Sequence, residues 1–443
     1  MKENLLFSRD TYLQTIRNVI GSEDVKIIIG MRRSGKSRFL LLLRNDVLKR
    51  TDAEHIIYIN FEDIEYDKLK VSATAAHEYI LDRMKDDGKY YLFLDEIQEV
   101  TEWQKLVNSL RLRNTDIYIT GSNSKIFSGV LATYLTGRCY PMNIYPLSFA
   151  EFIEFRKQSG LSKLKNEIKP GSSDYEYGLK DELAEYVRIG GFPLLSTFPY
   201  SQNDIKTLVE SIHSTAVLRD VIQRNVIRNT QLLEKIVAFI YDNIGSLISI
   251  TNIVNYLKEQ KRSAEYETIA NYLKALEDAY IVQRAQRYDV KGKKLLETND
   301  KYYIADHSLQ YAVRGNQIDN SSGVLENIVF MELVRRGYKV YVGKINMAAS
   351  KKKNEDEENN KTQKKAVDRE IDFVAEKNGS KVYVQVTTNL LSEDVIEREF
   401  RPLEAVRDHY PKYVVVYDSL FVGGNYNGVK CVTLKDFLLK QEL

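Results

Sequence analysis

The chain has 443 residues, more than one hydrophobic core usually organises, so we expect about two to four domains. Its composition, 43% hydrophobic and 28% charged, excludes a fibrous or largely disordered protein, and its net charge of +2 excludes a general attraction to nucleic acid or membrane. Two distant cysteines, Cys139 and Cys431, and the lack of any apolar run near the roughly 20 residues of a membrane span argue against a disulfide framework and a membrane partner, and favour the cytoplasm.

The first 150 residues alternate short β-rich runs with helical stretches, a pattern that predicts βαβ units around a parallel sheet. The runs are nearly continuous in apolar residues, as expected for strands buried on both faces. The predicted strands are residues 25–29, 55–61, 90–94, 117–120 and 140–144.

A phosphate-binding loop is predicted directly after the first strand. GMRRSGKS at residues 30–37 matches the pattern G-x-x-x-x-G-K-[ST] and precedes a helix predicted over residues 38–50. Its two glycines let backbone N–H groups point at a phosphate chain, and Lys36 is expected to reach the β- and γ-phosphates of ATP. The residues predicted to bind the nucleotide are Gly30, Met31, Arg32, Arg33, Ser34, Gly35, Lys36, Ser37 and Arg38.

A pair of acids completes the predicted ATPase chemistry. Four β-formers in YYLFLDEIQ, residues 90–98, end in Asp95 and Glu96, which places both carboxylates at the carboxyl end of a strand. Ser37 and Asp95 are predicted to hold Mg²⁺, and Glu96 to activate the attacking water as general base. The next strand ends in GSNS, residues 121–124, where Asn123, or Ser122 in its place, is predicted to sense the γ-phosphate.

Residues 151–225 are mostly helical in pattern, broken by a glycine–proline turn at residues 190–193, and we interpret them as an appendage to the sheet domain. Helices at 232–244, 250–260 and 264–279, followed by strands at 280–288 and 301–304, have the outline of a winged helix. The helix that would read DNA has four acids against one lysine: Glu265, Glu267, Glu277, Asp278 and Lys274. This charge disfavours sequence-specific DNA binding, and leaves open both a backbone contact through Lys291, Lys293 and Lys294 and a protein-packing role.

The last part of the chain is predicted to be a second α/β unit. An apolar helix at 324–336 precedes strands at 338–342, 370–375, 381–387, 413–417 and 429–434. Between the first two strands, residues 348–365 form a low-complexity run of mixed charge, which predicts a mobile loop rather than a basic nucleic-acid arm.

Seven segments in fixed order identify a resemblance: GMRRSGKS, FLDEIQ, Trp103-Gln104, TGS at 120–122, LTGR at 135–138, PLSFAEF at 146–152 and GGFP at 190–193. The chain resembles AAA-type ATPases of archaea and bacteria with a restriction-endonuclease-like C-terminal domain of unknown function. The resemblance implies an α/β fold: a P-loop NTPase core at residues 1–155 with a parallel sheet, a helical lid at 156–228, a winged-helix domain at 229–310, and a PD-(D/E)xK nuclease-like domain at 311–443 with its mobile loop at 345–368.

The resemblance also implies further site residues. Arg138 is expected to act as an arginine finger, in cis or across a subunit interface, with Arg188 and Arg219 as competitors. The nuclease-like site would use Glu326, Asp372 and Gln385, but Thr387 stands where such enzymes have a lysine, which predicts a degenerate site.

The sequence therefore predicts an ATPase that uses Mg²⁺-ATP hydrolysis as a conformational switch for its C-terminal domains. Two alternatives remain open: an ATP-gated nuclease, and a nucleotide-dependent regulatory protein with negligible turnover. The partners predicted besides ATP are a second copy of the chain, an unknown protein and, less favoured, nucleic acid.

Overall fold

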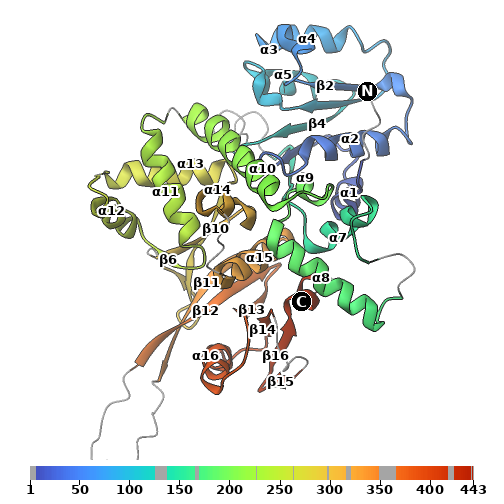
Figure 1. Cartoon of the computed structure of the whole chain (residues 1–443). Helices are drawn as coiled ribbons and strands as arrows, with labels where there is room; N and C mark the ends of the chain where they lie inside the picture. Colours follow the sequence, from blue (N-terminus) through green and yellow to red (C-terminus); the bar gives the residue numbers. More distant parts are fainter. Residues whose placement is uncertain are drawn as a thin grey trace, which may run out of the picture.

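The computed structural model describes residues 6–124, 137–164, 169–225, 227–262, 264–296, 299–315, 321–348, 366–417, 424–440 and 442. An N-terminal sheet domain lies at one end of the molecule, and a larger C-terminal sheet lies at the other, with helices between them (Figure 1). Within the described residues, every helix is too short or too polar to cross a membrane.

The N-terminal sheet is parallel, as predicted, with strand order β2-β3-β4-β1-β5. Its strands are β1 (Val25–Ile29), β2 (Ile56–Asn60), β3 (Tyr90–Asp95), β4 (Thr115–Gly121) and β5 (Cys139–Asn143). Helices α1 (Asp10–Arg17) and α2 (Lys36–Val47) pack on one face, and α4 (Ala73–Leu81) and α5 (Trp103–Leu110) on the other. Strand β4, which ends in the GSNS segment, lies between β3 and β1, at the centre of the sheet.

The helices that follow connect this sheet to the rest of the molecule. They are α7 (Phe149–Gln158), α8 (Ser173–Ile189), α9 (Pro193–Ser196), α10 (Gln202–Thr215) and the π-helix η5 (Ala216–Gln223). The predicted turn before α9 packs closely against Asp306, which precedes η6. A Cβ at Gly190, where φ is 81°, would lie 2.1 Å from Asp306 Oδ1, and Asp306 Oδ2 accepts a hydrogen bond from the Gly191 backbone N–H at 2.7 Å.

The middle part has three helices, α11 (Thr230–Asp242), α12 (Ile250–Glu259) and α13 (Tyr266–Asp278), as predicted. Its small sheet has the order β6-β10-β7, formed by Leu247–Ile248, Asp300–Ile304 and Val282–Ala285. The predicted strand at 280–288 is wrong in extent, because its second half is a separate strand, β8 (Arg287–Asp289). With β9 (Lys294–Leu295), β8 joins the C-terminal sheet, where Tyr288 packs against Tyr341. The predicted wing is therefore not a free hairpin.

The C-terminal sheet has eight strands in the order β15-β16-β14-β13-β12-β11-β8-β9. Its own strands are β11 (Lys339–Ala348), β12 (Ala366–Lys377), β13 (Ser380–Thr387), β14 (Lys412–Val416), β15 (Asn425–Tyr426) and β16 (Val429–Thr433). Helices α15 (Ser321–Arg335), α16 (Glu393–Glu404) and α17 (Leu434–Leu439) cover it. Strands β11 and β12 form a long ribbon (Figure 1) and stay paired as far as Ala348 and Ala366. The predicted loop at 345–368 is therefore too long at both ends, and residues 349–365 lie outside the described residues.

The shorter elements connect these layers. They are η1 (Ala53–His55), η2 (Ile64–Tyr66), α3 (Asp67–Lys70), η3 (Ile97–Glu99), η6 (His307–Gln310) and α14 (Tyr311–Arg314). One continuous cluster of buried apolar side chains runs from α7 and α8 through the middle sheet to one face of the C-terminal sheet. The boundaries predicted at residues 228 and 310 fall inside this shared core.

Candidate functional site

The loop at residues 30–37 joins β1 to α2 in a conformation that depends on its glycines. Gly30 has a φ of 146°, and a Cβ there would lie 2.1 Å from the carbonyl oxygen of Ile144. Gly35, at φ 101°, ends the loop immediately before α2. Contact excludes a side chain at Gly30, and the positive φ favours glycine at Gly35. With these two glycines the backbone wraps around the space above the first turn of the helix.

Lys36 lies in that space with its ammonium largely uncommitted to other charges. Its Nζ donates a hydrogen bond to the carbonyl oxygen of Met31 at 3.1 Å, and no described carboxylate forms an ion pair with it. Burial lowers the pKa of Lys36, although the nearby carboxylates of Glu96 and Asp220 oppose this effect. The hydroxyl of Ser34 is also buried and without a hydrogen-bond partner among the described residues. An anion in this space would satisfy the Lys36 ammonium, whereas Ser34 is not among the residues that line the space.

Arg9, a buried arginine that was not predicted from the sequence, supports the loop through its backbone. Arg9 Nη1 donates to the carbonyl oxygen of Ser34 at 3.0 Å, while its Nε and Nη2 each donate to the carboxylate of Glu151 at 2.9 Å. Glu151 also closes the N-terminal turn of α7 by accepting the backbone N–H of Ser148. Through Arg9, Glu151 of the segment PLSFAEF is connected to the phosphate-binding loop.

Asp95 and Glu96 lie at the carboxyl end of β3, beside the loop, as predicted. Asp95 Oδ1 accepts hydrogen bonds from Ser37 Oγ at 3.1 Å and from Thr120 Oγ1 at 2.5 Å. Burial raises the pKa of Asp95, and the Thr120 hydrogen bond partly offsets it. The Glu96 backbone N–H donates to Thr120 Oγ1 at 2.8 Å, and its φ of 51° turns the chain sharply after β3. The Glu96 carboxylate accepts a hydrogen bond from Gln98 Nε2.

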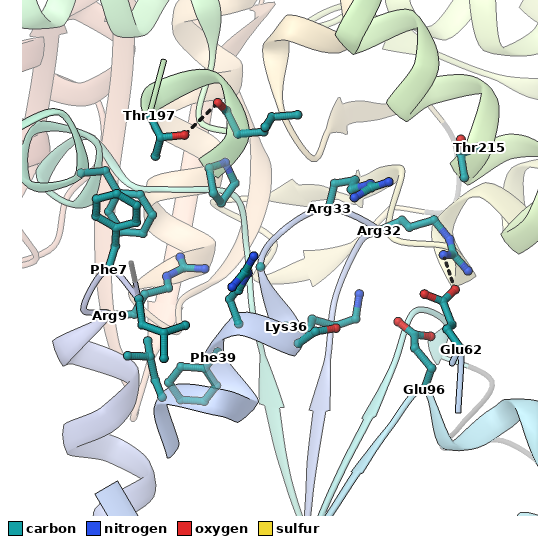
Figure 2. Close-up of a pocket in the computed structure, with 18 of the residues that line it drawn as sticks. Phe7, Arg9, Arg32, Arg33, Lys36, Phe39, Glu62, Glu96, Thr197 and Thr215 are labelled. Atoms are coloured by element: carbon teal, nitrogen blue, oxygen red, sulfur yellow. Dashed lines mark hydrogen bonds and ion pairs between the residues drawn. The ribbon is translucent and has the colours of Figure 1, made fainter. Parts of the chain in front are cut away.

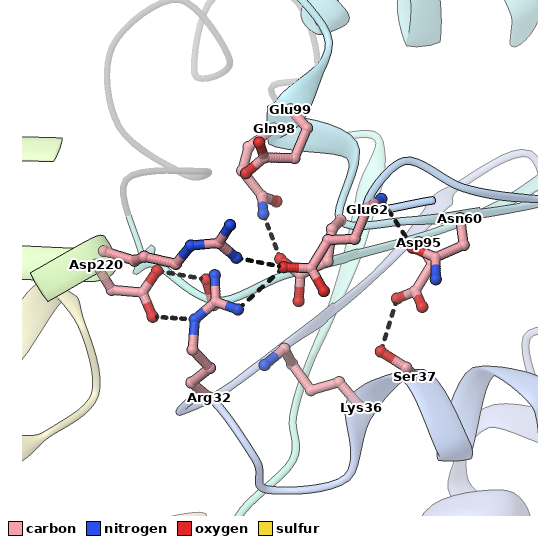
Figure 3. Close-up of polar contacts among 12 residues, drawn as sticks. Arg32, Lys36, Ser37, Asn60, Glu62, Asp95, Gln98, Glu99 and Asp220 are labelled. Atoms are coloured by element: carbon pink, nitrogen blue, oxygen red, sulfur yellow. Dashed lines mark hydrogen bonds and ion pairs between the residues drawn. The ribbon is translucent and has the colours of Figure 1, made fainter. Parts of the chain in front are cut away.

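A network of alternating charges lies on the other side of Lys36 (Figure 3). Arg32 Nε donates to Asp220 Oδ2 at 3.0 Å and its Nη1 to Glu62 Oε1 at 3.1 Å. The same Glu62 oxygen accepts from Arg219 at 2.9 Å, and Arg224 lies 3.5 Å from Asp220. Although burial by itself lowers the pKa of Arg32, Asp220 and Glu96 raise it, so this guanidinium keeps its charge.

The predicted sensor residues point at the same acid. Ser122 Oγ donates to Asp220 Oδ1 at 2.9 Å, and Asn123 Nδ2 donates to the Asp220 backbone carbonyl at 3.2 Å. Ser124 continues the line by donating to Asp278, at the end of α13, at 2.9 Å. Asp220 lies on η5, where the helix widens to π geometry, a feature frequent at functional sites.

Arg32, Lys36, Ser37, Glu62 and Glu96 border a cavity of about 720 Å³, whereas Asp95, Ser122, Asn123 and Asp220 are not part of its lining. Figure 2 shows its charged end at Lys36, Glu96, Glu62 and Arg32 and its apolar end near Phe7 and Phe39. The apolar lining comes from the N-terminal segment, α2, α7 and α9: Leu6, Phe7, Phe39, Leu42, Phe155, Pro193 and Leu194. Phe7 stacks on Phe155 with ring centroids 4.8 Å apart.

The remaining residues predicted for this site divide into two groups. Arg33 and Arg38 border the cavity, whereas the side chain of Met31 is buried in the core. The structure does not bring Arg138 to this cavity within one chain, because Arg138 is exposed and precedes β5, at the end of the sheet opposite the loop. Arg188 bonds Glu185 and Gln202 on the lid, and of the three predicted arginines only Arg219 lines the cavity.

The residues of the predicted degenerate nuclease site lie in the C-terminal sheet. Glu326 and Asp372 come together, and Gln385 Oε1 accepts the backbone N–H of Asp372 at 3.2 Å. Thr387 donates to the Asn389 carbonyl oxygen instead of joining them. The cation near the two acids is Lys301 of β10, which the sequence analysis did not single out.

Comparison with known proteins identifies the class of the N-terminal domain. Residues 22–153 match the model of a family described as an AAA domain, and residues 180–320 match a domain of unknown function, DUF8612. Together with the loop geometry, this match makes the N-terminal part a P-loop ATPase domain of the AAA type.

The whole chain belongs to a family with members in bacteria and archaea. An uncharacterized protein of Haemophilus influenzae is 34% identical over 98% of this chain and 99% of its own length. An uncharacterized protein of Methanocaldococcus jannaschii is 32% identical over 76% of this chain and 71% of its own length. Among solved structures, the Walker-type ATPase of Pyrococcus abyssi has 15% identity and a TM-score of 0.45 over 71% of this chain and 97% of its own.

Proposed function

We propose that this chain binds Mg²⁺-ATP at residues 30–37, hydrolyses it, and uses the bound nucleotide to switch the arrangement of the helices and sheets that follow residue 155. The observation that carries the proposal is that Lys36, Ser37 and Glu96 line one cavity with an apolar far end, while Asp95 lies behind Ser37 and accepts its hydrogen bond. Nucleotide binding is the part supported by the AAA family match, while turnover and switching go beyond that match.

The polar end of the cavity fits a triphosphate. The uncommitted Lys36 ammonium lines the cavity and needs an acceptor, and the loop backbone leaves no room for a side chain at Gly30. Ser37 and Asp95 offer the oxygen ligands that Mg²⁺ prefers, and the ion would neutralise charge between the phosphates. The apolar end matches the faces of an adenine ring, which would lie among the side chains near Phe7 and Phe39.

Glu96 is the proposed general base. Its carboxylate lies one residue beyond Asp95, borders the cavity, and is held by Gln98, so it is placed to orient a water molecule and accept its proton. Arg32 and Arg219 border the same end and would stabilise the charge that develops on the transferred phosphoryl group. In the structure, both arginines are held by Glu62, an acid that an incoming phosphate would have to displace.

The contacts of Asp220 support the switching part of the proposal. This one buried acid binds Arg32 of the phosphate loop and Ser122 of the sensor segment, and its own helix carries Arg219. A phosphate that binds Arg32 would remove one of the partners of Asp220. Ser124 then provides a direct contact from the sensor segment to α13 through Asp278.

The middle part is proposed to transmit this signal through packing rather than to read DNA. On α13, Asp278 contacts Ser124 and Lys274, so one of the four acids of the predicted reading helix is used within the chain. Its winged-helix identity is an interpretation of the element order, and the nuclease-like identity of the C-terminal sheet is what the family resemblance implies. The exposed Arg138 would contribute to a site only in a neighbouring copy, which makes the predicted homo-oligomer part of the proposal.

Phosphate release from ATP tests the proposal directly. Glu96→Gln should keep nucleotide binding and slow release by about 100-fold or more, because general-base assistance contributes on this scale. Glu102→Gln is the matched control, since Glu102 is an exposed glutamate six residues further along, at the start of α5. Equal rates for wild type, Glu96→Gln and Glu102→Gln would contradict hydrolysis, and would favour a nucleotide-dependent binding protein if ATP still bound.

A further inference from the structure

A second lysine, far from the nucleotide cavity, lies at the centre of an acidic cluster. Lys301 projects from β10 of the middle sheet, and its Nζ lies 3.1 Å from Glu326 on α15 and 2.6 Å from Glu370 on β12. The third acid, Asp372 on β12, is 3.8 Å away. The three acids belong to the C-terminal unit and the cation to the middle unit, so the cluster spans the predicted boundary at residue 310.

Burial makes these charges depend on one another. Lys301 is 2% exposed and Asp372 is 5% exposed, so neither is stabilised by bulk water. Burial by itself lowers the pKa of Lys301, but Glu326, Asp372 and Glu370 raise it above its ordinary value. Burial, and then Glu326, raise the pKa of Asp372 in turn. One ammonium thus lies among three carboxyl groups. Asp372, the acid furthest from it, is shifted toward its neutral form.

The surroundings fix the cluster in place. Tyr303 donates its hydroxyl to Glu326 at 3.1 Å, and the backbone N–H of Val386 donates to Asp372 at 2.8 Å. Strand β10 is bound to α15 by two hydrogen bonds between the Asn327 side chain and the Ile304 backbone, at 2.8 and 2.9 Å. The ring of Tyr303 also stacks on Phe330 of α15 at 4.3 Å. These contacts hold β10, and Lys301 with it, against α15 and the acids of the cluster.

We propose that Lys301 is a built-in counter-ion that takes the place of a divalent metal ion among Glu326, Glu370 and Asp372, and so closes the acidic centre of the C-terminal sheet to metal. Carboxylate oxygens that converge on one point are the ligands of hard divalent cations such as Mn²⁺ and Mg²⁺. Here, that point is the Lys301 nitrogen. Within the part of the chain that the structure describes, no group of three or more His, Cys, Asp or Glu side chains is placed to hold a metal ion.

A different use of the same residues would make Lys301 part of a metal-dependent nuclease. The geometry favours the closed centre, because a nuclease needs access for a phosphodiester and a metal ion. Lys301, Glu326 and Asp372 are buried, and of the four residues only Glu370 is partly exposed, with its side chain at 30%. The C-terminal sheet would then serve as a metal-free packing or binding unit. This conclusion does not depend on ATP hydrolysis, so the proposal for Lys301 and the proposal for the ATP site are tested independently.

Metal rescue of a lysine deletion tests the proposal. The full-length protein is unfolded by heat without nucleotide, in EDTA and in millimolar Mn²⁺, as wild type, Lys301→Met and Lys301→Met/Asp372→Asn. We expect Lys301→Met to unfold several degrees lower than wild type in EDTA, and Mn²⁺ to restore most of this loss. Wild type and the double variant should show no such gain. Any weak Mn²⁺ binding at the ATP site is common to all three proteins and cancels in the comparison.

Lys344→Met is the matched control, because Lys344 pairs with Asp368 on the same sheet but is 29% exposed. It should unfold close to wild type and be insensitive to Mn²⁺. The proposal is overturned if Lys301→Met gains nothing from Mn²⁺, or if wild type gains stability that Asp372→Asn removes. Nucleic-acid cleavage by wild type with Mn²⁺, lost in Asp372→Asn, would overturn it as well. If Lys301→Met does not fold with or without Mn²⁺, Lys301→Gln, which keeps a hydrogen-bond donor, is measured in the same way and decides by the same criteria.

Discussion

Two buried lysines, Lys36 and Lys301, show how similar local chemistry leads to different roles. Each lies near acids, Lys36 beside the carboxyl end of β3 and Lys301 between α15 and the middle of β12, and they are 4% and 2% exposed. Lys36 donates to a backbone carbonyl and faces a cavity, and its pKa is lowered by burial. Although burial acts on Lys301 as well, three carboxylates surround it and raise its pKa.

This difference distinguishes a buried lysine that can bind an anion from outside the chain from one whose anionic partners belong to the chain. A buried cation without a carboxylate partner carries a desolvation cost that an incoming phosphate relieves, so binding energy is available for a ligand. When a buried cation already has partners in the chain, they compensate its desolvation, so a ligand gains little by binding it. Its ion pairs stabilise the fold instead. The two lysines should therefore respond in opposite ways to the same substitution.

The largest effect is expected from Lys301→Met. Removing the ammonium leaves three clustered carboxyl groups without a counter-charge, and breaking a buried pair in this way typically costs about 3–5 kcal/mol. Urea unfolding of the wild type and the variant measures the free energy of unfolding. A loss below about 1 kcal/mol, as for an exposed pair, would contradict the contrast between the two lysines.

Lys36→Met should reverse the pattern. Because Lys36 has no ion-pair partner among the described residues, its loss should leave the free energy of unfolding unchanged or slightly raised. ATP affinity should instead fall roughly tenfold to hundredfold, since a hydrogen bond to a charged group contributes about 1.5–3 kcal/mol. Titration calorimetry measures the affinity. Unaltered ATP binding together with lower stability would show that Lys36 is structural.

The sequence predicted the ATP-site lysine but not the structural one, for a physical reason. Residues 30–37 and Asp95 follow local patterns, because a phosphate loop needs glycines at fixed spacing and a parallel strand needs an apolar run. The partners of Lys301 are up to 71 residues away (372 − 301), and no local pattern connects them. One signal was present, because Lys301 begins the strand predicted at 301–304. If that strand is fully buried, as β10 is, its lysine requires a buried counter-charge.

The same limit applies to the lid and the wing. Asp220 bonds Arg32 across 188 residues, and the only sequence signal was its place among the apolar positions of η5, beside Val217 and Val221. Strand β8 was predicted as a continuation of β7, because the run at 280–288 has no break in its residue pattern. The break arises only because β11, far along the chain, offers β8 a partner. Long-range pairing, not propensity, decides these elements.

A smaller effect is expected when arginines at the two ends of the N-terminal sheet are compared. Arg219 lines the cavity, whereas Arg138 is exposed at the opposite end. Arg219→Ala should slow ATP hydrolysis at saturating ATP by about tenfold, the effect of roughly 1.4 kcal/mol on the barrier. Arg138→Ala should have less effect in a dilute monomer. A larger loss from Arg138→Ala that depends on protein concentration would show that a neighbouring chain completes the site.

The smallest expected effect concerns pH and separates the acids of the Lys301 cluster. Burial raises the pKa of Asp372, so the folded chain retains a proton that the unfolded chain releases above its ordinary pKa near 3.8. The folded state then binds more protons, and Asp372 makes stability fall as pH rises from that value toward the folded pKa. Asp372→Asn removes this titration and should flatten the pH dependence of the unfolding free energy, by at most about 1.4 kcal/mol per pH unit. Urea unfolding between about pH 5 and pH 8 measures the slope. An unchanged slope in Asp372→Asn would mean that Asp372 is already ionised in the fold over this pH range, and that Lys301 neutralises it.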